Sequence, residues 1–223
     1  MKSLLALLAL ATTVAMTPAA KADSFNFSFS GGGLSGSGVI DVSNTPVPKV
    51  PGAYQVTGIR GTFSDSNQGI SNATITGLQT TGLPTVTNAN GTFVPPGTAA
   101  DGFGFSYDNL FYPGGDSPWV CPPTPGEKLY PFHGGVLDIY GLLFNVEGGY
   151  SVDLWSNGVL PVDGLTYGAG DSKNGVKLTT FGEPFSGTSL DVSTSPVPEP
   201  ASLMLMGTGL LGLVGTLRRK FAA

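Results

Sequence analysis

The side chains best suited to chemistry in this 223-residue chain are its one histidine and its one cysteine. Nucleophilic catalysis needs a serine or cysteine beside a base, and His133 is the only imidazole that could activate Cys121. In the simpler interpretation, His133 is a polar loop residue and Cys121 is either buried or paired with a second chain. No G-x-S-x-G elbow occurs. We therefore predict a protein that is not an enzyme and has no catalytic residues.

Carboxylates offer two further kinds of site. Asp138 and Asp153 lie on the two strands of a predicted hairpin, and a carboxylate pair across a cleft would suit glycoside hydrolysis. Asp163 and Asp171 could contribute oxygens to one calcium ion, but no D-x-D-x-D-G loop is present and turn formation explains them more simply. We predict no metal site and no cofactor, and keep a hydrolase of extracellular polysaccharide as the second alternative function.

Aromatic side chains that stack on sugar rings would make a carbohydrate-binding module, which is the first alternative. The candidate platforms are Trp119, Trp155, Tyr112 and Tyr140. Tryptophan and tyrosine on strands more often pack in the core or on a sheet face. Their exposure in the structure decides between the two interpretations.

These residues must be positioned by strands, because apolar residues alternate with polar ones through the body. Phe25, Phe27 and Phe29 would place three rings on one face of a strand. Further strands are predicted at 39–42, 54–63, 70–78, 103–107, 136–146, 150–155, 164–167, 176–181 and 188–192. Glu147-Gly148-Gly149 predicts a tight hairpin, and residues 80–100 and 112–134 predict long loops. The pattern favours an antiparallel β-sandwich, jelly-roll-like or a partly open barrel.

Composition narrows the class of protein. The chain contains 34 glycines and 18 prolines, and only 11% of its residues are charged. Between residues 23 and 196 five basic side chains face fourteen acidic ones, so the body is acidic. A nucleic-acid-binding surface needs clustered lysine and arginine, and we therefore exclude nucleic acid as a partner.

The N-terminal residues have the pattern of a secretory signal peptide. Lys2 precedes an apolar run from Leu4 to about Ala15, and Ala20-Lys21-Ala22 forms an A-x-A site before Asp23. We predict a signal helix over residues 1–22 that signal peptidase removes after Ala22. The body would then be exported across the inner membrane.

The C-terminal residues carry a second signal. Val197-Pro198-Glu199-Pro200 precedes an uncharged stretch from Ala201 to Leu217, which ends at Arg218-Arg219-Lys220. Seventeen residues of helix would reach roughly 25 Å, the short end of a membrane span. The basic cluster would stay in the cytoplasm because lysine and arginine beside a span resist translocation.

These three features in this order resemble the PEP-CTERM sorting tail, a segment also catalogued as the ice-binding protein C-terminal domain. The resemblance covers residues 197–223. It implies an exported protein of a Gram-negative bacterium that is transiently anchored in the inner membrane. Pro198, Glu199 and Pro200 would be recognised by an exosortase, which removes the tail and delivers the body to the cell surface or the extracellular polysaccharide.

Together the patterns predict three segments: a signal peptide at 1–22, a β-rich ectodomain at 23–196, and a sorting and transmembrane segment at 197–223. The expected function of the body is structural or adhesive, in the extracellular matrix. Extracellular polysaccharide would be its partner in the carbohydrate-binding alternative.

Overall fold

The computed structural model describes residues 24–48, 50–79, 86–87, 93–94, 107–119, 133–183, 186–197 and 209. Signal-site residues Ala20, Ala22 and Asp23 lie outside this part of the chain, as does Cys121. Within the described residues, no helix combines the length and the apolar character that a membrane crossing needs. The predicted transmembrane segment 201–217 lies outside the described residues except for Gly209.

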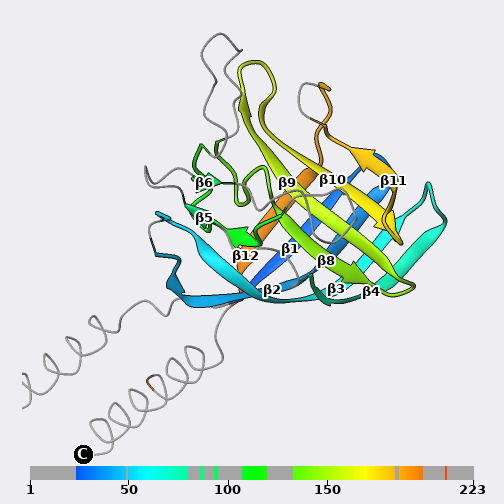
Figure 1. The fold of residues 1–223 in the computed structure, drawn as a ribbon, viewed down its shortest axis with the longest axis horizontal. Coiled ribbons are helices and arrows are strands. Elements are labelled where there is room, and N and C mark those ends of the chain that lie inside the picture. Colours follow the sequence, from blue (N-terminus) through cyan, green and yellow to red (C-terminus); the bar gives the residue numbers. More distant parts are fainter. Residues whose placement is uncertain are drawn as a thin grey trace, which may run out of the picture. The chain divides into compact units, whose positions relative to one another are not determined.

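The described body is almost entirely antiparallel β-sheet, which confirms the predicted all-β class (Figure 1). Its compact unit extends from Asp23 to Ser195. The ten strands of the main sheet are β1 (Ser24–Gly31), β2 (Leu34–Pro46), β3 (Tyr54–Asp65), β4 (Ile70–Leu78), β7 (Leu110–Phe111), β8 (Leu142–Val146), β9 (Tyr150–Leu160), β10 (Gly164–Lys173), β11 (Val176–Phe181) and β12 (Asp191–Pro196). Strands β5 (Val86–Thr87) and β6 (Phe93–Val94) form a separate pair.

The strand order along the main sheet is β11-β10-β9-β8-β4-β3-β2-β1-β12, with β7 attached to β3. Strands β1 to β4 and strands β8 to β11 are therefore two meanders, each built from sequential antiparallel neighbours. A jelly roll would instead interleave distant strands. The predicted jelly-roll connectivity is not observed among the described strands.

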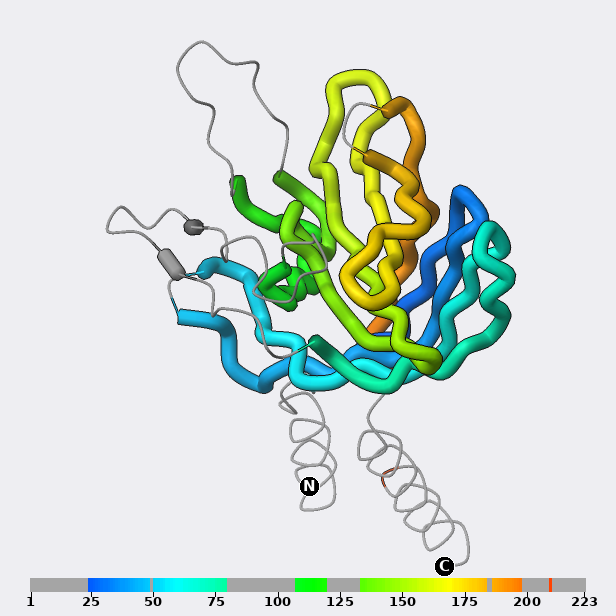
Figure 2. The backbone as a smooth tube through the Cα atoms, turned by 45° about the vertical axis from the view of Figure 1, so that its right-hand side comes forward, coloured from blue at the N-terminus to red at the C-terminus, as the bar shows by residue number. Residues whose placement is uncertain are grey.

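The sheet curls so that its two ends approach one another, as the tube in Figure 2 shows for the blue and yellow segments. Gly32, in the turn between β1 and β2, lies against the ring of Phe181 at the end of β11. A side chain at Gly32 would stand 2.1 Å from that ring, so only glycine permits the contact. Near β12, the Leu190 amide donates a hydrogen bond to the Tyr167 carbonyl of β10 at 3.0 Å.

The inside of the curl is an apolar core that follows the predicted alternation. Phe25, Phe27 and Phe29 are buried on one face of β1, and the rings of the last two stack with centroids 6.5 Å apart. Phe29 also contacts the ring of Phe63 of β3, which is fully buried. Burying an aromatic side chain contributes about 1.5–3 kcal/mol through the hydrophobic effect, so this face is a main source of stability.

One predicted strand is wrong over half its length. The chain was expected to be extended from Val136 to Val146, but β8 begins only at Leu142. Asp138 Oδ1 accepts hydrogen bonds from the amides of Tyr140 and Gly141, at 2.9 and 3.2 Å, which bends the chain into a turn. Gly141 has φ of 71°, a conformation that strands do not use.

Candidate functional site

The sorting motif begins where the folded sheet ends. Strand β12 is the outermost strand beside β1, and its last residue, Pro196, is followed at once by Val197. Most of its side chains are exposed, so few apolar contacts hold this edge. The other residues assigned to sorting and orientation lie outside the described residues: Pro198, Glu199, Pro200, Arg218, Arg219 and Lys220.

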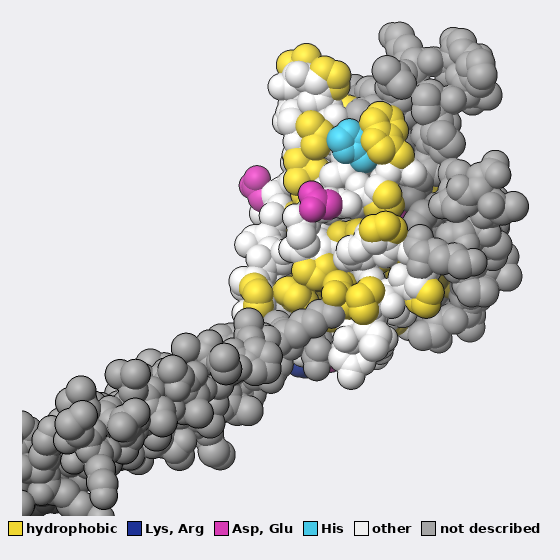
Figure 3. All heavy atoms as spheres, turned by 90° about the vertical axis from the view of Figure 1, so that its left-hand side faces the viewer, with side chains coloured by type: hydrophobic (Ala, Val, Ile, Leu, Met, Phe, Trp, Pro, Cys, Tyr) yellow, Lys and Arg dark blue, Asp and Glu magenta, His cyan; other side chains and the backbone are white. Residues whose placement is uncertain are grey.

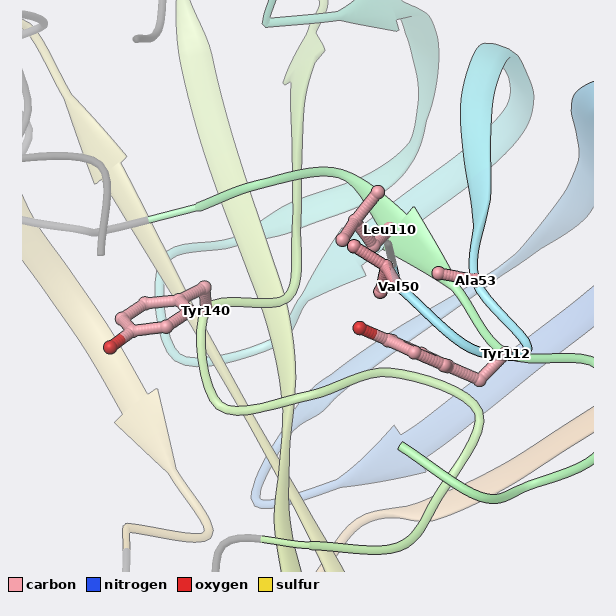
Figure 4. Packing of buried hydrophobic residues seen from close by; sticks show 5 residues of the cluster. All are labelled: Val50, Ala53, Leu110, Tyr112 and Tyr140. Atoms are coloured by element: carbon pink, nitrogen blue, oxygen red, sulfur yellow. The ribbon is translucent and has the colours of Figure 1, made fainter. Parts of the chain in front are cut away.

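Three of the four predicted stacking platforms are core residues. Tyr112, Tyr140 and Trp155 are only 1%, 5% and 6% exposed, so none of them offers a ring face to a sugar. Tyr112 packs with Val50 and Leu110 in an apolar cluster between the loops and β7 (Figure 4).

Trp155 is buried because the residue opposite it is a glycine, which leaves room for the indole ring. It lies opposite Gly168 in the ladder between β9 and β10, and a side chain at Gly168 would come within 2.4 Å of the indole ring. The indole Nε1 donates a hydrogen bond to Asn157 Oδ1 at 2.9 Å, which satisfies its one polar atom. The same Asn157 donates to the Gly182 carbonyl at 2.6 Å. The ring is therefore fixed in the structure and unavailable to a ligand.

Trp119 differs because it is 43% exposed and rests against an imidazole. Its ring and that of His133 have centroids 4.5 Å apart and planes inclined by 33°. Backbone hydrogen bonds hold the two residues in place: the Gly134 amide donates to Ser117 O at 2.8 Å, and the Val159 amide donates to His133 O at 3.0 Å. His133 is thus packed against an aromatic ring, while Cys121, its predicted catalytic partner, lies outside the described residues.

Further apolar side chains are exposed on the neighbouring hairpin of β9 and β10. Val159 and Leu165, which are paired in the ladder, are 44% and 43% exposed, and Val162 at the turn is 92% exposed. We call these three residues and Trp119 the Trp119 surface. Figure 3 shows the histidine beside apolar side chains on one face of the body. Exposed apolar residues that gather in this way are typical of a contact surface for another molecule.

The buried carboxylates form a polar network instead of a cleft. Asp108 and Asp138 are 6% and 1% exposed and lie close enough for the charge of Asp138 to act on Asp108. Burial raises the pKa of Asp108 well above its usual value, and the negative charge of Asp138 raises it further. Burial also raises the pKa of Asp138, although the hydrogen bonds that it accepts from the Tyr140 and Gly141 amides lower it.

Tyr112 belongs to the same network. Its hydroxyl donates to Asp138 Oδ2 at 3.2 Å, and burial followed by the charge of Asp138 raises the pKa of the phenol. Asp153 of β9 is also buried near Asp108. The sequence analysis placed Asp138 and Asp153 on two strands of a hairpin, but Asp138 lies in the turn before β8.

The predicted calcium alternative at Asp163 and Asp171 is not supported by their placement. Asp163 lies in the turn before β10, whereas Asp171 lies near the far end of that strand. Eight residue steps at ~3.3 Å each place them roughly 26 Å apart, too far for one ion. Among the described residues, no group of three or more His, Cys, Asp or Glu side chains has the arrangement of a metal site.

Two shallow pockets on the described surface contain none of these carboxylates. One lies around the hairpin of β8 and β9 at Glu147 to Ser151, and the other between β1 and β12. Neither includes His133 or Trp119. Of the predicted site residues, Asp138 and Asp153 thus lie in the buried polar network, whereas Trp119 and His133 form an aromatic pair at the surface.

Known proteins share a sequence motif with the C-terminal tail of this chain but show no match to its body. Residues 196–220 match the PEP-CTERM protein-sorting motif. No curated protein and no solved structure matches the chain. The motif is that of an exported protein with a C-terminal tail that an exosortase processes. The chain is a PEP-CTERM sorting domain-containing protein.

Proposed function

We propose that this protein is an exported component of the bacterial cell surface or extracellular matrix, with a structural or adhesive body that is not an enzyme. The observation that carries the proposal is the sorting motif at residues 196–220, directly after the last strand of the sheet. Signal peptidase and an exosortase would remove the two ends. The body would remain as a partly open barrel, supported by the contact between Leu190 and Tyr167 across its open side.

Intact mass of the mature protein tests the processing. In a Gram-negative host with an exosortase, we expect a mass that lacks residues 1–22 and residues C-terminal to the motif. A Glu199→Ala chain provides the matched control, because it changes the motif and leaves every described residue intact. A C-terminus that still ends at Ala223 in the unaltered chain would overturn the proposal.

Adhesion is assigned to the Trp119 surface, because it presents exposed apolar side chains on a folded hairpin. We expect Trp119→Ala and Val159→Ser to lower retention of the processed protein in the matrix fraction. Val176→Ser is the matched control, since Val176 is 61% exposed and pairs with Lys173, at the opposite end of β10 from Leu165. Equal retention of all three variants would argue against an adhesive role for this surface.

A second function is favoured by Trp119 itself. An exposed indole supported by His133 has the form of a sugar-stacking platform, which makes polysaccharide binding by the body the alternative. A glycan array with the processed protein tests it: binding that Trp119→Ala abolishes would favour a carbohydrate-binding module, whereas an empty array would favour the purely structural body.

A further inference from the structure

A second pair of buried carboxylates joins the two meanders. Asp65 ends β3, Asp171 lies in β10, and both are 0% exposed. Thr179 of β11 contacts both of them. Its hydroxyl donates to Asp65 Oδ2 at 2.5 Å, and its amide donates to Asp171 Oδ1 at 2.9 Å. The two carboxylates therefore converge on one residue.

One oxygen in this cluster has no partner. Asp171 Oδ2 is buried and forms no hydrogen bond. The donors that reach the cluster from Asn67 and Thr179 are neutral. Burial, and then the charge of Asp65, raises the pKa of Asp171. A buried carboxylate oxygen without a donor is costly, so the site calls for a positive ligand or a proton.

We propose that Asp65 and Asp171 bind a calcium ion between the β3–β4 turn and the β10–β11 hairpin. Calcium takes six to eight oxygen ligands, which carboxylates, neutral oxygens and water supply together. Thr179 Oγ1 is one neutral oxygen already in contact with Asp65. The two carboxylates would balance the double positive charge of the ion, and the other ligands would be neutral oxygens.

One side-chain amide provides a further oxygen. Gln68 Nε2 is 3.5 Å from Thr179 Oγ1, and a half-turn of this amide exchanges its nitrogen for its oxygen, because the two ends have nearly the same shape. Asn67 remains a donor, because its Nδ2 donates both to Asp65 Oδ1 and to the Gly32 carbonyl, each at 2.9 Å. Both side chains are exposed, so the cluster lies directly beneath the surface and an ion can enter past them.

A proton on Asp171 is the rival occupant, and it predicts different behaviour. A protonated Asp171 would make the site insensitive to calcium. Calcium binding requires both carboxylates to be ionised, so it would release the proton that the empty site holds. Proton release on adding calcium therefore separates the two occupants.

The test uses the full chain in detergent micelles at pH 7. Thermal unfolding is followed with 10 mM CaCl₂, with 10 mM MgCl₂ and with EDTA. For an affinity in the range of extracellular calcium modules, the midpoint should rise by roughly 3–10 °C with calcium. Calorimetric titration of calcium in two buffers of different protonation enthalpy then measures proton release.

Three variants complete the design. Asp171→Asn should abolish the calcium-dependent rise, and Gln68→Ala should reduce it without altering the buried residues. Asp163→Asn, an exposed carboxylate at the other end of β10, is the matched control and should retain the full rise. No rise in the unaltered chain, or an equal rise in all three variants, would overturn the proposal; if Asp171→Asn fails to fold, an undiminished rise in Gln68→Ala together with no proton release would do so.

Discussion

Asp108 and Asp138 are both buried, and the charge of Asp138 acts directly on the Asp108 carboxyl group. Two adjacent buried carboxylates cannot both be ionised cheaply, so the pair retains a proton that the unfolded chain releases. Stability therefore depends on pH through this contact.

We expect the free energy of unfolding to fall as pH rises. The pKa of both groups is raised in the folded protein, so their contribution is complete below the unfolded pKa of about 4 and is lost as pH rises through the folded values. Each pH unit of this window costs about 1.4 kcal/mol. Urea unfolding between pH 4 and pH 8 measures it. Asp108→Asn, which has nearly the same shape but cannot ionise, should flatten the dependence, and an unchanged slope in that variant would contradict the assignment.

Removal of the acceptor in this network should destabilise the fold. Asp138 accepts from Tyr140 N, Gly141 N and the Tyr112 hydroxyl, so Asp138→Ala leaves buried donors without partners. We expect a loss of about 2–4 kcal/mol, because each buried unsatisfied donor costs about 1–3 kcal/mol. Urea midpoints of Asp138→Ala and of the exposed control Asp163→Ala measure the difference. A loss below about 0.5 kcal/mol would show that the turn tolerates the missing acceptor.

Trp155 and Gly168 predict a packing effect. A side chain at Gly168 would lie 2.4 Å from the indole and 2.6 Å from the Gly182 carbonyl, so Gly168→Ala should cost about 1–3 kcal/mol. Gly58→Ala in β3 is the matched control, since its new atom would meet only the carboxylate end of Asp41, at 3.3 Å. Equal thermal midpoints for the two variants would be inconsistent with the tight ladder contact.

The two tryptophans should respond differently to a quencher. Trp119 is 43% exposed, whereas Trp155 is 6% exposed and hydrogen-bonded. Iodide should therefore quench only part of the fluorescence, and Trp119→Phe should remove the accessible part. Trp155→Phe is the reciprocal variant. Complete quenching in Trp119→Phe would show that Trp155 is not in the core.

The sequence predicts the repeating parts of this fold well and its exceptions poorly. The hairpin at Glu147 to Gly149 joins β8 and β9 as expected, because glycine and alternation are local signals. The turn at Asp138 has no such signal in the local sequence pattern. Its residues alternate as in a strand, but the Asp138 carboxylate accepts hydrogen bonds from the Tyr140 and Gly141 amides, and these bonds bend the chain into a turn.

The buried aspartates escape prediction for a similar reason. Asp65 and Asp171 are far apart in the chain and meet only because the sheet curls. Their inward direction on β3 and β10 is visible in the period of each strand, but carboxylates in such positions usually face water. The exposure of Trp119, in contrast to the other platforms, likewise depends on how loops fold over the sheet.

The junction between β12 and the sorting motif would link release of the protein to the state of its fold. Only Val197 separates the last residue of β12, Pro196, from the Pro-Glu-Pro residues, so a processing enzyme would have little chain to bind without contacting the sheet. Fraying of a few terminal pairs would lengthen that reach, because edge strands with few apolar contacts open at low cost. Opening of β12 would then set the rate of cleavage. Variants in which β12 pairs more firmly with β1 would be released from the membrane more slowly.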